Sequence, residues 1–141
     1  MDEPPDVDLP PLLLVVEDLE EAYDLFSQFL ADAGFRVVGA CNGIDAIDSA
    51  VRLLPDAILM DLSLPRMGGC EAAKLLKQDE RTSHIPIVAV TAHEDLADIA
   101  RESGCDAFFT KPCPLDRLLD RVRALVYGEV ETPARKTQLQ N

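Results

Sequence analysis

The chain has 141 residues, 48% of them apolar and 5% aromatic, which suits one domain with an aliphatic core. Its 26 acidic and 13 basic residues give a formal net charge of −13, which disfavours nucleic acid and anionic membranes and favours metal cations and basic or apolar protein partners. The longest aliphatic run, at 12–16, is far too short to span a bilayer, and the acidic N-terminus lacks the basic start of a secretory signal. We therefore expect a cytoplasmic protein that binds neither nucleic acid nor membrane.

The two ends of the chain differ in composition from its middle. Residues 1–10 hold three prolines and four acids, a composition that cannot build a core and predicts a disordered leader. Residues 128–141 are polar and predict a short tail, which leaves one domain at 11–127. Only 13 residues follow Gly128, so we expect either a single-domain protein that acts through protein contacts or a piece of a larger one.

The middle of the chain alternates short aliphatic runs with helical stripes. An aliphatic run at 12–16 precedes apolar residues spaced three and four apart over 22–33, a helix that Gly34 ends. A run at 36–40 precedes a helix over 47–54 that stops before Pro55, and a run at 57–60 precedes a shorter helix at 71–78. A run at 87–90 and a helix at 95–103 come next, followed by a run at 107–110 and a helix over 115–126 with Pro114 near its start.

This alternation predicts the fold class. The aliphatic runs are too uniformly apolar for strands with one wet face, and they suit strands buried on both faces. A strand followed by a helix, repeated five times, predicts an α/β fold with a doubly wound parallel sheet covered by helices on both faces. Ligands of such sheets bind beyond the carboxyl ends of the strands, so the functional residues are sought there.

Four of the five predicted strands end in polar side chains. The first is followed by Glu17 and Asp18, the third ends in Asp61, the fourth ends in Thr91, and the fifth runs into Lys111. If the first and third strands are neighbours, three carboxylates crowd into one pocket, which is costly unless a cation neutralises them. Mg²⁺ takes carboxylates, waters and phosphate oxygens as ligands. The pattern predicts a Mg²⁺ site open to a phosphoryl group, with Asp61 as a nucleophile that forms an acyl phosphate.

Each of these residues also has a simpler interpretation on its own. The acidic pair could be a helix N-terminal charge, Thr91 a helix N-cap and Lys111 a surface lysine. Because all of them occur at strand ends, their coincidence favours one shared Mg²⁺ and phosphoryl site over separate roles.

The four cysteines lack a C-x-x-C spacing and are interpreted as small packed thiols. The two histidines, His84 and His93, are interpreted as surface residues outside the site.

Four ordered motifs over about residues 12–126 resemble response regulator receiver domains. Residues 14–18 resemble the strand with the family's acidic pair, and residues 60–69 resemble the phosphoacceptor loop with its proline, methionine and glycine. Residues 85–92 resemble the switch strand with its hydroxyl residue. Residues 104–112 resemble the segment that ends in the family's lysine and a cis peptide bond to proline. The resemblance implies a flavodoxin-like receiver fold with strand order 2-1-3-4-5 and five helices.

The resemblance also implies a phosphorelay function for the strand ends. Asp61 would accept a phosphoryl group from a histidine kinase, a histidine phosphotransfer protein or a small phosphodonor. Glu17, Asp18 and Asp61 would hold Mg²⁺ together with the backbone carbonyl of Ser63. The protein would catalyse only its own phosphorylation and dephosphorylation, and would not act on external substrates.

The remaining implied roles concern the switch. Thr91 and Lys111 would bind phosphoryl oxygens, and the Ala92 backbone N–H would add a donor. Phe108 would change rotamer when Thr91 moves, and a downstream protein would bind the face formed by the fourth helix, fifth strand and fifth helix. Two residues depart from the family's pattern: Glu17 stands where Asp is commonest, which suggests a metal contact through water, and Phe108 lacks a tyrosine hydroxyl.

Other functions on the same fold would need other residues at the strand ends. An FMN binder of the same fold would need an anion-binding loop after the first strand, where residues 17–21 are almost all acidic. A phosphatase of the haloacid dehalogenase type would need a second acid two residues after its nucleophile, where this chain has Ser63. A receiver-like interaction module that does not cycle phosphate, or the isolated receiver domain of a larger regulator or hybrid kinase, stays open.

Overall fold

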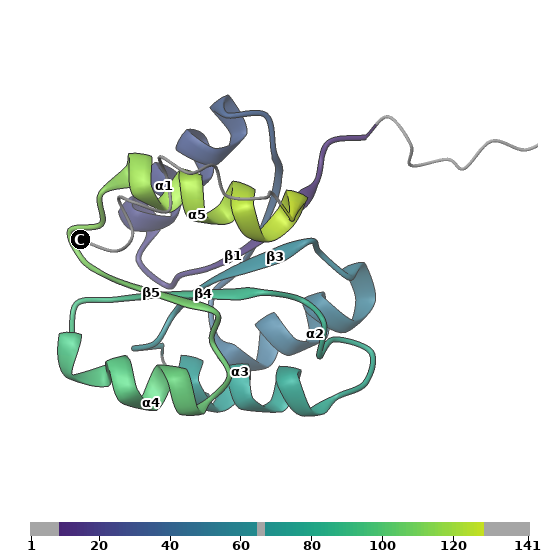
Figure 1. Cartoon of the computed structure of the whole chain (residues 1–141), viewed down its shortest axis with the longest axis vertical. Coiled ribbons are helices and arrows are strands. Elements are labelled where there is room, and N and C mark those ends of the chain that lie inside the picture. Colours follow the sequence, from purple (N-terminus) through teal and green to yellow (C-terminus); the bar gives the residue numbers. More distant parts are fainter. Residues whose placement is uncertain (1–8, 65–66, 129–141) are drawn as a thin grey trace, which may run out of the picture.

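The computed structural model describes residues 9–64 and 67–128, which form a five-stranded parallel sheet in the order β2-β1-β3-β4-β5 with helices on both faces (Figure 1). The predicted doubly wound fold and the strand order are confirmed. The elements in chain order are β1 (Leu12–Val16), α1 (Glu20–Asp32), β2 (Arg36–Ala40), α2 (Gly43–Leu53), β3 (Ala57–Asp61), α3 (Gly69–Gln78), β4 (Ile87–Thr91), a short 3-10 helix (Glu94–Leu96), α4 (Ala97–Glu102), β5 (Ala107–Thr110) and α5 (Leu115–Tyr127).

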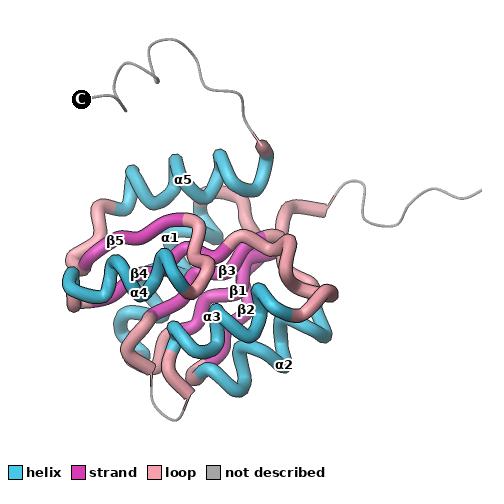
Figure 2. Tube along the Cα trace, turned by 60° about the horizontal axis from the view of Figure 1, so that its bottom comes forward, coloured by secondary structure: helices cyan, strands magenta, loops and turns pink. Residues whose placement is uncertain are grey.

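The central strands are buried on both faces, as their uniform apolar sequences predict. Successive strand side chains point to opposite faces of a sheet, so each strand supplies two separate cores. Leu13 and Val15 of β1 pack with residues of α1 and α5, whereas Leu14 and Val16 pack with residues of α2, α3 and α4. Figures 1 and 2 show this division, with α1 and α5 on one face of the sheet and α2, α3 and α4 on the other.

The two edge strands differ from the prediction of burial on both faces. Every residue of β3 and β4 is buried, but β2 and β5 are only partly buried. An edge strand has a neighbouring strand on one side only, and its helices cover it less completely. The aliphatic sequence of an edge strand does not reveal this difference, because sheet position is decided by the crossovers.

The helix C-termini agree with the turn signals to within one residue, but α1 begins at Glu20 rather than at 22 and α2 at Gly43 rather than at 47. Gly34 follows α1 with a φ of 105°, and α2 ends at Leu53 with a left-handed Leu54 before Pro55. Helix α3 begins at Gly69, two residues before the predicted start, because the apolar periodicity used to find it begins only after the glycines. The helix predicted at 95–103 is divided into the 3-10 turn and the six-residue α4, a tightening that is common at helix N-termini.

The predicted leader and tail lie mostly outside the described residues, so the domain boundaries at 11 and 127 stay predictions. Within the described ranges, no helix has the length and apolarity needed to cross a membrane.

Candidate functional site

The polar residues predicted at the strand ends lie together at one edge of the sheet. Glu17 and Asp18 directly follow β1, Asp61 ends β3, and Thr91 ends β4. Parallel pairing of β1 with β3 and of β3 with β4 brings these ends side by side. Lys111 follows β5, and its backbone N–H donates to the Thr91 carbonyl at 2.8 Å, which holds the lysine beside the same edge.

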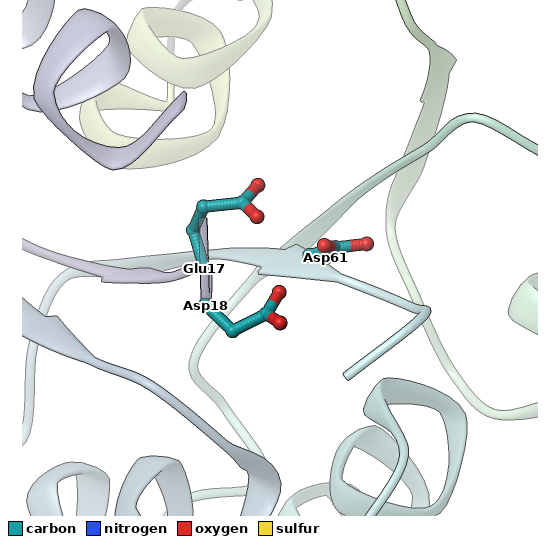
Figure 3. Close-up of side chains that lie close together, drawn as sticks. All are labelled: Glu17, Asp18 and Asp61. Carbon is teal, nitrogen blue, oxygen red and sulfur yellow. The ribbon is translucent and has the colours of Figure 1, made fainter. Parts of the chain in front are cut away.

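Three carboxylates share this pocket. Figure 3 shows Glu17 and Asp18 reaching from the end of β1 towards Asp61, and one oxygen of each carboxylate lies within 4.8 Å of the others. Glu17 and Asp61 are buried, with 4% and 6% of their surfaces exposed, whereas Asp18 is exposed. The predicted gathering of the three acids is confirmed. Carboxylate oxygens this close can serve as ligands of a hard divalent cation.

The Lys111 ammonium lies between two of these carboxylates. Its Nζ is 2.8 Å from Oε1 of Glu17 and 3.7 Å from Oδ2 of Asp61. The side chain of Glu17 is 2% exposed and that of Lys111 is 23% exposed, so this is a largely buried ion pair. The sequence pattern placed Lys111 towards a phosphoryl group and missed that it neutralises part of the acidic pocket. The feature of the sequence that could have revealed this pairing is the glutamate at position 17, because its side chain is one methylene longer than that of aspartate and extends the carboxylate towards the lysine.

Burial and neighbouring charges shift the pKa values of this ion pair. Burial raises the pKa of Glu17 above its usual value of 4.5, the Lys111 hydrogen bond lowers it, and the charge of Asp61 adds to the rise. Burial lowers the pKa of Lys111, but the Glu17 hydrogen bond and the charge of Asp61 outweigh it, and the net shift is upward from 10.5. Lys111 is therefore a cation at neutral pH.

Backbone and hydroxyl groups orient Asp61 and Thr91. Oδ1 of Asp61 accepts a hydrogen bond from the Ser63 backbone N–H at 3.0 Å. The Ser63 hydroxyl lies 3.4 Å from the Thr91 hydroxyl, whose oxygen also accepts from the His93 backbone N–H at 3.3 Å. Thr91 is fully buried. Sequence reasoning considered only the carbonyl of Ser63 and missed its N–H and hydroxyl, because a serine in a loop carries no distinctive pattern.

The His84 and His93 side chains are exposed, as predicted, although the His93 backbone lies at the site.

Two glycines hold the segments around Asp61 in close contact. A Cβ at Gly69 would lie 2.3 Å from the backbone oxygen of Asp61, and the Gly69 N–H donates to the Leu62 carbonyl at 3.3 Å. The Gly43 N–H at the start of α2 donates to the Met67 carbonyl at 3.2 Å. The first turns of α2 and α3 thus brace the residues that follow the phosphoacceptor candidate.

Two further features of the resemblance lie on β5 and after it. The Lys111–Pro112 peptide bond is cis, as the resemblance implied. Phe108 is half-buried and packs against the core on the α2, α3 and α4 face, opposite Ala89 of β4. Its rotamer change stays a prediction.

Comparison with known proteins decides the family. A family model described as the response regulator receiver domain matches residues 13–123. The chain belongs to this family. Receiver domains accept phosphoryl groups, bind Mg²⁺ at the acidic pocket, and interact with histidine kinases and downstream targets. The protein is thus a receiver domain of response regulators, and its buried acidic cluster fits the family's Mg²⁺ and phosphoaspartate site.

Curated relatives and solved structures agree with this assignment. The polar-differentiation response regulator DivK of Brucella anthropi is 36% identical over 118 residues, covering 82% of this chain and 96% of that protein. A putative response regulator from Chloroflexus aurantiacus has a TM-score of 0.79 at 29% identity, covering 84% of this chain and 98% of that one. The receiver domain of the sensor histidine kinase PA1611 from Pseudomonas aeruginosa, solved with a magnesium ion in its active site cleft, has a TM-score of 0.78 at 28% identity, covering 83% and 98%.

Proposed function

We propose that Asp61 is the phosphoacceptor of a Mg²⁺-dependent signalling switch. The observation that carries this proposal is the environment of its carboxylate. Oδ1 is held by the Ser63 N–H, while Oδ2 faces Lys111 at 3.7 Å and accepts no hydrogen bond from the residues that the structure describes. Oδ2 is therefore the oxygen available to attack phosphorus, and the Lys111 ammonium lies beside it in the same pocket.

The transfer is a displacement at phosphorus. With a phosphohistidine donor, Oδ2 of Asp61 forms the new bond to phosphorus and the P–N bond breaks. The electron pair of the P–N bond stays on the imidazole, which leaves as the neutral ring when its other nitrogen carries a proton. With acetyl phosphate the P–O bond breaks and acetate leaves with the electron pair. Asp61 then carries an acyl phosphate, and attack of water on this group would be the protein's own dephosphorylation.

The residues of the acidic pocket fit a Mg²⁺ ion, because three carboxylate oxygens lie within 4.8 Å of one another and two of the carboxylates are buried. Asp18 and Asp61 would hold the ion with the Ser63 backbone carbonyl, and Glu17 would contribute through water. Bound there, Mg²⁺ would neutralise charge on the carboxylates and on the phosphoryl oxygens.

Thr91 and Lys111 would bind the phosphoryl oxygens together with the Ala92 backbone N–H. Capture of the Thr91 hydroxyl would separate it from Ser63 and shift the segment after β4, with Phe108 following. Phosphorylation stabilises the shifted conformation only if the phosphoryl group binds that conformation better than the unshifted one. The face formed by α4, β5 and α5 would then present a changed surface to a downstream protein, and a histidine kinase or phosphotransfer protein would be the donor. The cytoplasmic location stays a prediction.

The proposal is tested with acetyl phosphate, Mg²⁺ and intact-protein mass spectrometry. The wild-type protein should gain one phosphoryl group and Asp61→Asn should gain none. Asp48→Asn serves as the matched control, because its carboxylate is 73% exposed on α2, where it pairs with Arg52 and with no residue of the site. Lys111→Ala should keep some phosphorylation but lose the change at the α4–β5–α5 face, seen as backbone NMR shifts.

The same experiment includes the outcomes that would overturn the proposal. An Asp61→Asn protein that gains the same mass as wild type would remove Asp61 from its role. A wild-type protein that gains no mass would favour the interaction module that does not cycle phosphate.

A further inference from the structure

The lysine of the acidic pocket is held by Glu17 rather than by the nucleophile. The 2.8 Å contact between Lys111 Nζ and Glu17 Oε1 is a short, charge-assisted hydrogen bond, whereas the 3.7 Å separation from Asp61 Oδ2 is too long for one. We propose that Glu17 is a positioning residue that keeps the Lys111 ammonium off Oδ2 of Asp61 until a phosphoryl group arrives. This inference rests on the proposed role of Asp61 as the phosphoacceptor.

Both oxygens of Glu17 have partners, which anchors its carboxylate. Oε1 accepts from Lys111, and Oε2 accepts from the Leu19 backbone N–H at 3.2 Å. The side chain is also 2% exposed, so bulk solvent has little access to these contacts. A carboxylate satisfied at both oxygens inside the protein holds one orientation and fixes the ammonium that it binds.

The length of the Glu17 side chain is what reaches the lysine. An aspartate at this position would withdraw the carboxylate by one carbon–carbon bond, about 1.5 Å. The shorter carboxylate would lose the hydrogen bond to Lys111 or that to the Leu19 N–H. The nearest remaining acceptor described for the ammonium is Oδ2 of Asp61, which is already 3.7 Å away. Glu17 therefore decides which carboxylate holds the lysine.

A free Oδ2 matters for the transfer. An ammonium bonded to Oδ2 would occupy the lone pair that must form the bond to phosphorus and would stabilise the carboxylate before it reacts. Once Oδ2 carries phosphorus and the bond to the leaving group has broken, the ammonium lies within reach of the new phosphoryl oxygens. Lys111 then leaves Glu17 for the phosphoryl group, so it binds the product state rather than blocking the attack.

The first test compares variants without metal or phosphodonor. In EDTA at neutral pH, NMR would record the Asp61 side-chain carboxyl carbon and the Lys111 ammonium. Glu17→Asp shortens the arm, and Glu17→Gln keeps its length but removes its charge; both should move the two signals together as Lys111 pairs with Asp61. Glu21→Asp, an exposed acid of α1 with the same change in length, should leave both signals at their wild-type positions.

The second test measures phosphorylation by acetyl phosphate at saturating Mg²⁺. Glu17→Asp and Glu17→Gln should each react about tenfold more slowly, the factor expected when a nucleophile must first break one charged hydrogen bond. In a Lys111→Ala background the same substitutions should have no further effect, because the proposed role of Glu17 acts through the lysine.

Three outcomes overturn the inference. The first is an Asp61 carboxyl signal that does not move in EDTA in either folded variant. The second is a rate that saturating Mg²⁺ restores to the wild-type value, which would make Glu17 a metal ligand only. The third is an equal loss of rate with and without Lys111. A wild-type protein that is not phosphorylated would refute the proposed function instead, and the metal-free NMR comparison would still decide where Lys111 is held.

Discussion

Replacing Gly69 by alanine would place a methyl group against the backbone at the end of β3, beside Asp61. The new Cβ would lie 2.3 Å from the Asp61 carbonyl oxygen and 2.7 Å from the Leu62 Cα. Both are backbone atoms, so no side-chain rotation can relieve the contact. The adjacent glycine is a matched control, because a Cβ at Gly68 would meet its nearest atom, the Leu62 carbonyl oxygen, at 3.9 Å, an ordinary contact.

The expected cost follows from these distances. Relief of the contact requires the first turn of α3 or the end of β3 to move by about 1 Å, and such overpacking costs about 1–3 kcal/mol. The helix propensity of alanine over glycine returns up to about 1 kcal/mol. We expect Gly69→Ala to lower the free energy of unfolding by about 1–2 kcal/mol. Gly68→Ala should change it by less than about 0.5 kcal/mol, because loss of the N-cap glycine and lower unfolded-state entropy oppose each other.

Urea unfolding and phosphorylation by acetyl phosphate would measure both effects. A shift of about 1 Å at Asp61 should slow phosphorylation by up to about a hundredfold, because displacement at phosphorus depends on the alignment of the attacking oxygen. Gly68→Ala should react at nearly the wild-type rate. If Gly69→Ala unfolds at the same urea concentration as Gly68→Ala and reacts as fast, the close approach does not position Asp61.

Three further predictions concern stability, thiol reactivity and pH. Thr82→Val should lower the free energy of unfolding by about 1–3 kcal/mol, because the fully buried Thr82 hydroxyl donates to the Leu76 carbonyl at 2.7 Å. Thr82→Ser keeps the hydroxyl, so its free energy of unfolding should fall by less in the same urea titration. A disulfide reagent at pH 8 should label the exposed Cys41 first, because burial raises the pKa of Cys105 to about 12; equal labelling rates by peptide mass mapping would contradict this. Because the pKa of Glu17 is raised above 4.5, its contribution to stability is present below that pH and is lost as pH rises through the folded value. Thermal melting in EDTA should therefore show a steeper loss above pH 4.5 for wild type than for Glu17→Gln, and parallel curves would refute this assignment.

The sequence predicted the placement of most of the site, because the site lies where strands end. Glu17, Asp61 and Thr91 are recognisable as polar residues that close aliphatic runs, and parallel strands bring their carboxyl ends to one edge. No comparable signal existed for the N–H and hydroxyl of Ser63, which depend on how the loop after β3 folds back on Asp61.

What the sequence by itself determined was the alternation of strands and helices and the residue types at the strand ends, since both follow from local periodicity and turn chemistry. Only the tertiary structure decided that the edge strands β2 and β5 are half-exposed, because sheet position depends on crossovers between distant segments. It also decided the partner of Lys111. Glu17 and Lys111 are separated by 94 positions in the chain, and a difference of 0.9 Å between two carboxylates sets which one holds the ammonium. Local sequence carries no measure of such a distance, because it arises from the sheet order β1-β3-β4-β5, which brings the ends of distant strands to one edge with their side chains.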